Sequence, residues 1–185
     1  VGVFFLLLIL PAVNAEAKEV SLVKGDAIRY MGYSTHYYYV DGNLAFCLEP
    51  DMKSPGTGVY SASELDPRSH LSKAMYYMYG GPGYEQYIKS SLTGGWGEDA
   101  NAYCLTHCVL SYIYDGCDQN SAAFKGLNAD IASAVVMYAD YVKNLPDIPD
   151  AELAFSENGL TTYYDREQKC QRTQSIRLVG DTANS

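Results

Sequence analysis

Residues 37–48 read Tyr-Tyr-Tyr-Val-Asp-Gly-Asn-Leu-Ala-Phe-Cys-Leu, and this stretch predicts a β-hairpin. Aromatic and β-branched residues favour strands, so we expect one strand over 37–40 and a second over 44–48. The Asp-Gly-Asn sequence between them is a tight-turn signal, because these residues tolerate the backbone angles of a hairpin turn. Since Pro50 ends the second strand, Cys47 lies near a strand end, where a side chain can meet a cleft.

The segments on either side of this hairpin define the fold class. Apolar residues at three- and four-residue intervals indicate helices, and short runs rich in β-branched and aromatic residues indicate strands. We expect further strands over 20–23, 27–30, 151–155, 160–164 and 170–179, helices over 71–79, 99–114 and 121–144, and a loop over 51–60. The order predicts an α+β fold, with a sheet or barrel-like core and helices inserted between the N-terminal and C-terminal strands.

Val1–Ala15 is apolar, too short to cross a bilayer comfortably, and followed by polar residues. Val13 and Ala15 are the small residues that a signal peptidase needs, so we interpret 1–15 as part of a signal peptide. The mature chain then begins at Glu16, and 16–185 forms one domain, with further domains or an anchor expected beyond Ser185. We expect no membrane insertion after cleavage.

The composition is acidic and rich in tyrosine. The net charge of −9 over 185 residues argues against nucleic acid and anionic membrane surfaces as partners, because both need basic patches. The 18 tyrosines supply rigid amphipathic area, suited to a sheet face or to a recognition surface.

The chain has five cysteines, an odd number that leaves at least one thiol unpaired in an exported protein. Cys104, His107 and Cys108 fall on one face of the helix expected over 99–114. With Cys117 they permit a structural zinc site, although the spacing matches no strong zinc motif and we predict no metal. The alternative is a disulfide from Cys104 or Cys108 to Cys117 or Cys170.

Cys47 and His107 also permit a catalytic pair, in which a histidine activates a thiol for hydrolysis. The local signatures that surround the nucleophiles of known cysteine proteases are missing here. A buried, unreactive Cys47 is the simplest alternative, since free cysteines are usually small core residues.

Several segments together resemble the thioester domains of Gram-positive surface adhesins. Phe46-Cys47-Leu48 matches that family's cysteine on an early strand, and 106–110, Thr-His-Cys-Val-Leu, matches its helix motif. A glutamine-bearing strand late in the chain matches its third element. Residues 46–50, 55–60 and 76–83 are similar to the clostridial branch. His107 stands where the family motif has glutamine, and Val109-Leu110 stand where an aliphatic residue and a tryptophan are expected.

The resemblance implies an internal thioester between the Cys47 sulfur and a glutamine side chain. The partner is Gln171 or Gln174, which strand alternation places on opposite faces, and we prefer Gln171. It also implies that His107 lines the site, where it would serve as a base for the incoming amine.

The function that follows is that of a cell-wall-attached adhesin domain, which captures an accessible lysine or other amine of a host or surface protein. Such a domain is not an enzyme, because it performs acyl transfer once, and it needs no cofactor. A non-covalent binding or stalk module on the same fold is the alternative, and a secreted cysteine hydrolase is a third hypothesis.

Overall fold

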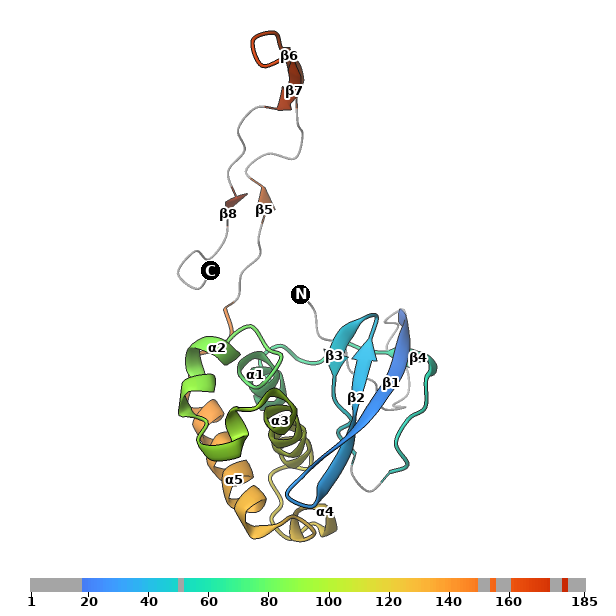
Figure 1. The fold of residues 1–185 in the computed structure, drawn as a ribbon, viewed down its shortest axis with the longest axis vertical. Helices are drawn as coiled ribbons and strands as arrows, with labels where there is room; N and C mark the ends of the chain where they lie inside the picture. Colours follow the sequence, from blue (N-terminus) through green and yellow to red (C-terminus); the bar gives the residue numbers. More distant parts are fainter. Residues whose placement is uncertain (1–17, 50–51, 150–153, 156–160, 174–177, 180–185) are drawn as a thin grey trace. The chain divides into compact units, whose positions relative to one another are not determined.

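A computed structural model describes residues 18–49, 52–149, 154–155, 161–173 and 178–179 (Figure 1). The predicted signal peptide therefore lies outside the described residues. The chain divides into two compact units, 1–147 and 148–185. No helix in the described ranges is long and apolar enough to cross a membrane.

The first unit begins with an open antiparallel sheet of order β3-β2-β1-β4. Its strands are β1 (Lys18–Tyr30), β2 (Tyr33–Val40), β3 (Asn43–Ala45) and β4 (Gly58–Ala62). The two separate strands predicted before residue 31 are one strand, and the Lys24–Ala27 interruption is a bulge in its pairing with β2. Strand β4 lies at the end of a stretch predicted to be a loop.

The predicted hairpin is confirmed as β2 and β3, joined by Asp41 and Gly42. Their φ angles of 50° and 81° are both positive, as a two-residue hairpin turn requires. The second strand is shorter than predicted, because it ends at Ala45 and leaves Cys47 two residues beyond it.

The helices follow the sheet and lie beside it (Figure 1). They are α1 (His70–Tyr77), α2 (Tyr84–Tyr87), α3 (Asp99–Tyr114), α4 (Ala122–Lys125) and α5 (Ala129–Lys143), with 3-10 turns η1 (Lys89–Ser91) and η2 (Gly94–Gly97). The single helix predicted over 121–144 is two helices. Gly126 ends α4, and the Asn128 side chain accepts a hydrogen bond from the Asp130 amide at 2.8 Å to cap α5.

Helix α3 has the predicted bounds, but it has no exposed polar face. Every residue from Asn101 to Ile113 is buried. Helices α1 and α5 pack against it, and the Tyr37 ring of β2 lies 4.7 Å from the Tyr103 ring. The polar residues of α3 are therefore interior groups that need partners inside the protein.

Apolar side chains form two clusters. The larger one surrounds α3 and joins the helices. The smaller one belongs to the sheet and consists of Val20, Leu22, Tyr38, Val40, Ala45 and Ala62, with Cys47 and Tyr60 packed against it. Cys47 thus packs against the sheet cluster, while its neighbour Leu48 belongs to the larger one.

The second unit contains two short antiparallel pairs. Strand β5 (Ala154–Phe155) pairs with β8 (Leu178–Val179), and β6 (Thr162–Asp165) pairs with β7 (Cys170–Thr173). The α+β class and the placement of helices between strands are confirmed. The described strands form open sheets, and no closed barrel is present among them. The single domain over 16–185 stays a prediction.

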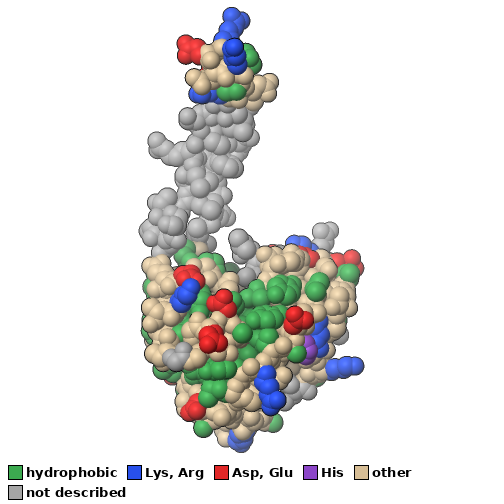
Figure 2. All heavy atoms as spheres, in the orientation of Figure 1, with side chains coloured by type: hydrophobic (Ala, Val, Ile, Leu, Met, Phe, Trp, Pro, Cys, Tyr) green, Lys and Arg blue, Asp and Glu red, His purple; other side chains and the backbone are tan. Residues whose placement is uncertain are grey.

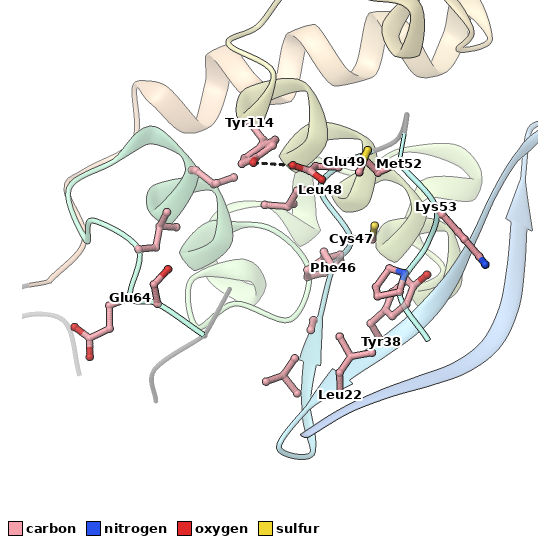
Figure 3. A pocket seen from close by; sticks show the side chains of 16 residues that line it. Leu22, Tyr38, Phe46, Cys47, Leu48, Glu49, Met52, Lys53, Glu64 and Tyr114 are labelled. Carbon is pink, nitrogen blue, oxygen red and sulfur yellow. Dashed lines mark hydrogen bonds between the residues drawn. The ribbon is translucent and has the colours of Figure 1, made fainter. Parts of the chain in front are cut away.

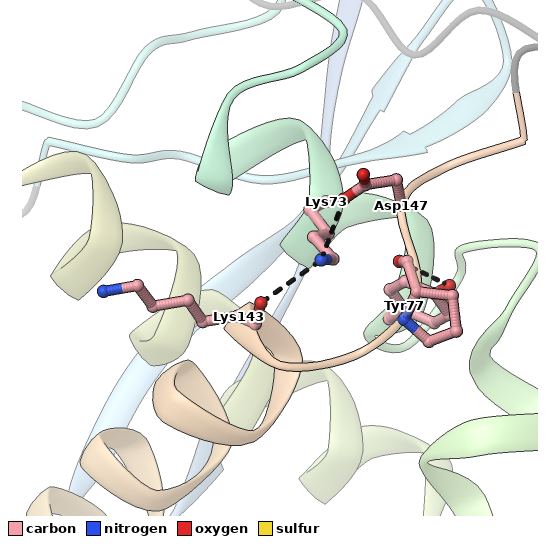
Figure 4. Close-up of polar contacts among 5 residues, drawn as sticks. Lys73, Tyr77, Lys143 and Asp147 are labelled. Carbon is pink, nitrogen blue, oxygen red and sulfur yellow. Dashed lines mark hydrogen bonds and ion pairs between the residues drawn. The ribbon is translucent and has the colours of Figure 1, made fainter.

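The end of α5 is attached to α1 by polar contacts (Figure 4). The Tyr77 hydroxyl donates to the Pro146 carbonyl at 3.0 Å. The Lys73 ammonium donates to the Lys143 carbonyl at 3.2 Å and pairs with the Asp147 carboxylate at 3.3 Å. Tyr77 is buried and Asp147 is fully exposed, so these contacts differ in strength.

We expect Tyr77→Phe to lower the free energy of unfolding by about 1 kcal/mol, because a hydrogen bond from a buried side chain is lost. Asp147→Asn removes only an exposed ion pair, whose contribution is below about 0.5 kcal/mol. Urea unfolding followed by circular dichroism measures both variants. An Asp147→Asn effect equal to or larger than that of Tyr77→Phe would contradict this ranking.

Candidate functional site

The segment that carries Cys47 runs along one face of α3. Residues 103, 107, 111 and 114 are spaced by three or four positions and therefore share this face. The Phe46 ring stacks on the Tyr103 ring at 4.7 Å, with its centroid 6.4 Å from that of His107. The Ser111 hydroxyl donates to the Cys47 carbonyl at 3.5 Å, and the Tyr114 hydroxyl donates to Glu49 Oε1 at 3.2 Å.

Tyr103 lies where strands β2 and β3 separate. Tyr38 pairs with Ala45, so continued pairing would place Cys47 opposite His36. Instead the fully buried Tyr103 hydroxyl lies 2.9 Å from both the His36 and the Ala45 carbonyl oxygens, which share its proton. The hydroxyl replaces the donor that the strand would have supplied. The chain is consequently free to turn away from the sheet at Cys47.

Cys47 is half-buried and lines a cavity of about 260 Å³ (Figure 3). Most of the side chains around the cavity are apolar. They are Leu22, Tyr38, Val40, Ala45, Phe46, Leu48, Met52, Pro55, Leu65 and Leu71. The polar lining consists of Glu49, Lys53, Ser63, Glu64 and Tyr114.

This environment keeps the Cys47 thiol protonated. Burial raises its pKa, and the Glu49 carboxylate raises it further, while the Glu49 backbone amide and the Lys24 ammonium act in the opposite direction. The charged thiolate is therefore disfavoured at neutral pH. The net effect on Cys47 is opposite to the lowered pKa that activates the nucleophile of a cysteine hydrolase.

His107 is buried beside this segment, and it is not among the residues that line the cavity. Its Nδ1 and the Tyr33 hydroxyl form a hydrogen bond of 2.7 Å, while its Nε2 has no hydrogen-bond partner among the described residues. Burial lowers the pKa of His107 to about 4, so the ring is neutral at pH 7. No hydrogen bond joins it to Cys47, which is the contact that the hydrolase hypothesis requires. Its roles in site lining and as a base stay predictions.

The other cysteines provide neither disulfides nor a grouped metal site in the part of the chain that the structure describes. All five cysteines are free thiols, so the disulfides considered for Cys104, Cys108, Cys117 and Cys170 are not formed. Burial raises the pKa of the Cys108 thiol and of the Tyr33 hydroxyl. No three His, Cys, Asp or Glu side chains among the described residues are arranged to hold a metal ion.

The predicted glutamine partners lie in the second unit. Gln171 is exposed on β7, opposite Tyr164, and Gln174 lies outside the described residues. Within residues 1–147 the sequence has only Gln86 and Gln119, which are exposed and do not line the Cys47 cavity. The first unit therefore offers Cys47 no glutamine at this cavity, and the choice between Gln171 and Gln174 stays a prediction.

Sequence reasoning missed the groups on α3 that position the Cys47 segment. Tyr103, Ser111 and Tyr114 belong to the predicted helix, and their shared face was visible in their spacing. The pattern does not show which loop lies against that face, because this depends on how the hairpin packs on the helix. Glu49 was noted only as part of the motif around Cys47.

The comparisons with known proteins give one match. The family model described as "Thioester domain" matches residues 19–149. No curated protein and no solved structure matches the chain. The matched stretch contains Cys47 and the whole of α3, and it ends before Gln171 and Gln174.

We expect Tyr103→Phe to lower the free energy of unfolding by about 1–3 kcal/mol, because the Ala45 and His36 carbonyls lose their donor inside the protein. Tyr112→Phe on the same helix is the matched control, since the Tyr112 hydroxyl has only a 3.5 Å contact from exposed Gln119. Urea unfolding measures both. Equal losses for the two variants would show that the Tyr103 hydroxyl has no special role.

His107 predicts a pH dependence of stability. Because its pKa is about 4 in the folded chain, against about 6.5 when unfolded, the unfolded chain binds the proton first as the pH falls. The contribution of neutral His107 to the free energy of unfolding is therefore complete above pH 6.5. It decreases by up to about 3 kcal/mol as the pH falls towards 4.

Replacing His107 with glutamine should therefore reduce the loss of stability between pH 7 and pH 4.5. Urea unfolding of the wild type and the variant at several pH values gives the two curves. An unchanged pH slope in His107→Gln would contradict the buried neutral state of this ring.

Proposed function

This chain belongs to the thioester-domain family, and from that premise we propose that Cys47 forms an internal thioester with a glutamine side chain. The bond serves to capture an amine-bearing partner covalently. The observation that carries the proposal is the place of Cys47, which lies inside the family-matched stretch and on the wall of a largely apolar cavity. Phe46 and Glu49, its neighbours in the motif, are held by α3.

The chemistry balances without a cofactor. The Cys47 sulfur attacks the carboxamide carbon of the glutamine, the C–N bond breaks, and ammonia leaves with the thiol proton. In the second step the nitrogen of an amine attacks the same carbon and the C–S bond breaks. An amide then joins the partner to the glutamine, and Cys47 is again a thiol.

The surroundings of Cys47 suit a stored acyl group. An apolar lining limits the access of water to the thioester, which slows hydrolysis. Burial raises the pKa of the thiol, and a thiolate of higher pKa is a poorer leaving group, so the bond persists until a strong nucleophile arrives. The same features argue against repeated turnover, because the thioester is consumed when it reacts.

We place the acyl half of the bond on Gln171, with Gln174 as the alternative, because the first unit has no glutamine at the cavity. The domain would act at the surface of a Gram-positive cell after export, attached to the cell wall through further domains. Its partner would be a host or surface protein with an accessible lysine. The negative net charge favours the approach of such cationic groups.

A non-covalent binding module is the second candidate, and one observation favours it. Figure 2 shows hydrophobic side chains gathered on one face of the first unit, between the sheet and the helices. Half-buried tyrosines such as Tyr37, Tyr39 and Tyr79 provide amphipathic surface of this kind. Binding through such a surface would survive Cys47→Ala, whereas covalent capture would not.

The mass of the intact chain tests the thioester directly. We expect the wild-type protein to be lighter than its sequence by one ammonia and to gain methylamine on exposure, because the amine opens the thioester. Cys47→Ala should have its encoded mass and gain nothing. Mass spectrometry under non-reducing conditions measures both.

The glutamine is identified by the same measurement. Gln171→Ala should abolish the ammonia loss while Gln174→Ala retains it, and peptide mapping of the methylamine adduct gives an independent assignment. The reverse pattern transfers the role to Gln174. An encoded mass in the wild-type chain, with no uptake of methylamine, would overturn the thioester proposal and leave the non-covalent module.

A further inference from the structure

The Cys47 cavity has a carboxylate beside the reacting sulfur. Glu49 follows Cys47 by two residues, and both line the cavity (Figure 3). Burial and the negative charge of Glu49 both raise the pKa of the Cys47 thiol. Such a negative group does not help a thiol to become a nucleophile, so its presence beside Cys47 needs another explanation.

Glu49 is held in place by α3. The Tyr114 hydroxyl donates to Oε1 at 3.2 Å, which leaves Oε2 without a hydrogen bond from the described residues. Burial and the Glu49 carboxylate both raise the pKa of Tyr114, so the phenol stays a donor. One carboxylate oxygen is therefore engaged by the protein, and the other is available to a molecule in the cavity.

An amine that reaches this cavity arrives with a proton that it must lose. A lysine side chain is an ammonium at neutral pH, and an ammonium has no lone pair with which to attack a carbonyl carbon. Its methylene stem suits the apolar walls, and its cationic head suits a carboxylate. His107 does not line the cavity and is buried, whereas Glu49 is at the wall.

We propose that Glu49 binds the incoming alkylammonium group and accepts its proton, so that the amine attacks the thioester formed by Cys47. This inference rests on the proposed function. The ammonium gives one proton to Glu49, its nitrogen attacks the acyl carbon, and the C–S bond breaks. The second proton passes from nitrogen to the Cys47 sulfur. Glu49 then releases its proton to water, and an amide and a thiol remain.

Several charged or titratable groups face this site. They are Tyr114 on α3, Lys24 on β1, Cys47 itself, and Lys53 and Glu64 on the cavity wall. Tyr114 is the group that hydrogen-bonds the carboxylate, and its raised pKa keeps it a donor. Without Glu49, the rate of capture depends on the small fraction of amine that is already uncharged. This rate rises with pH over the whole range.

The test is the rate of methylamine uptake by the thioester form of the full chain, followed by intact mass at several pH values. We expect Glu49→Gln to form the thioester and to react about 10²-fold more slowly at neutral pH. Its rate should then rise steadily with pH, while the wild-type rate levels off. Glu19→Gln is the matched control, because Glu19 is exposed and does not line the cavity, and it should react as the wild type does.

Hydroxylamine separates proton removal from a merely structural effect. It is uncharged at neutral pH, so Glu49→Gln and the wild type should react with it at similar rates. An equal slowing with both amines would assign Glu49 a structural role and overturn the proposal. A wild-type methylamine rate in Glu49→Gln would overturn it as well.

The failure of this inference is distinguishable from the failure of the proposed function. A wild-type chain without the ammonia loss overturns both. A thioester that forms and reacts in Glu49→Gln as in the wild type overturns the role of Glu49 alone. If Glu49→Gln forms no thioester, Glu49→Asp is tested in its place, because it keeps a carboxylate on a shorter side chain. Slowed methylamine uptake by Glu49→Asp with the wild-type pH profile supports the proposal. An unchanged rate overturns it.

Discussion

The hydroxyl of Tyr103 is the group on which the arrangement around Cys47 depends. It lies between the carbonyls of His36 and Ala45, where two paired strands part. Buried carbonyls need a donor, and a strand that leaves its neighbour normally removes one. Because a helix side chain supplies a donor to these two carbonyls, the segment from Phe46 to Glu49 can leave the sheet and run along α3.

This arrangement explains why α3 is buried on all sides although it carries polar residues. Tyr103, His107, Ser111 and Tyr114 form a row of polar groups on the face that meets the Cys47 segment. The opposite side of the helix belongs to the core shared with α1 and α5. One helix therefore serves both the packing of the first unit and the positioning of the Cys47 segment, so changes on α3 will affect stability and the geometry around Cys47 together.

The chemical character of the site follows from the same packing. The thiolate form of a cysteine at the edge of an apolar cavity is disfavoured. Such an environment does not suit the nucleophile of a hydrolase, but it suits a sulfur that is held in an acyl bond. The buried His107 is neutral and bonded to Tyr33. Thus the two residues that suggested a catalytic pair are neighbours through Phe46, and each has a different environment.

The sequence by itself determined the hairpin around Asp41-Gly42, the extent of α3 and the order of strands and helices, because turn chemistry and hydrophobic spacing are local properties. It also indicated Cys47 as a candidate site residue and a resemblance to the thioester-domain family. It did not determine where β3 ends, the break between α4 and α5, or the burial of α3. Only the tertiary structure decided which side chains surround Cys47. The contacts of Tyr103 with His36 and of Tyr114 with Glu49 join residues more than sixty positions apart, and such pairings arise when elements pack.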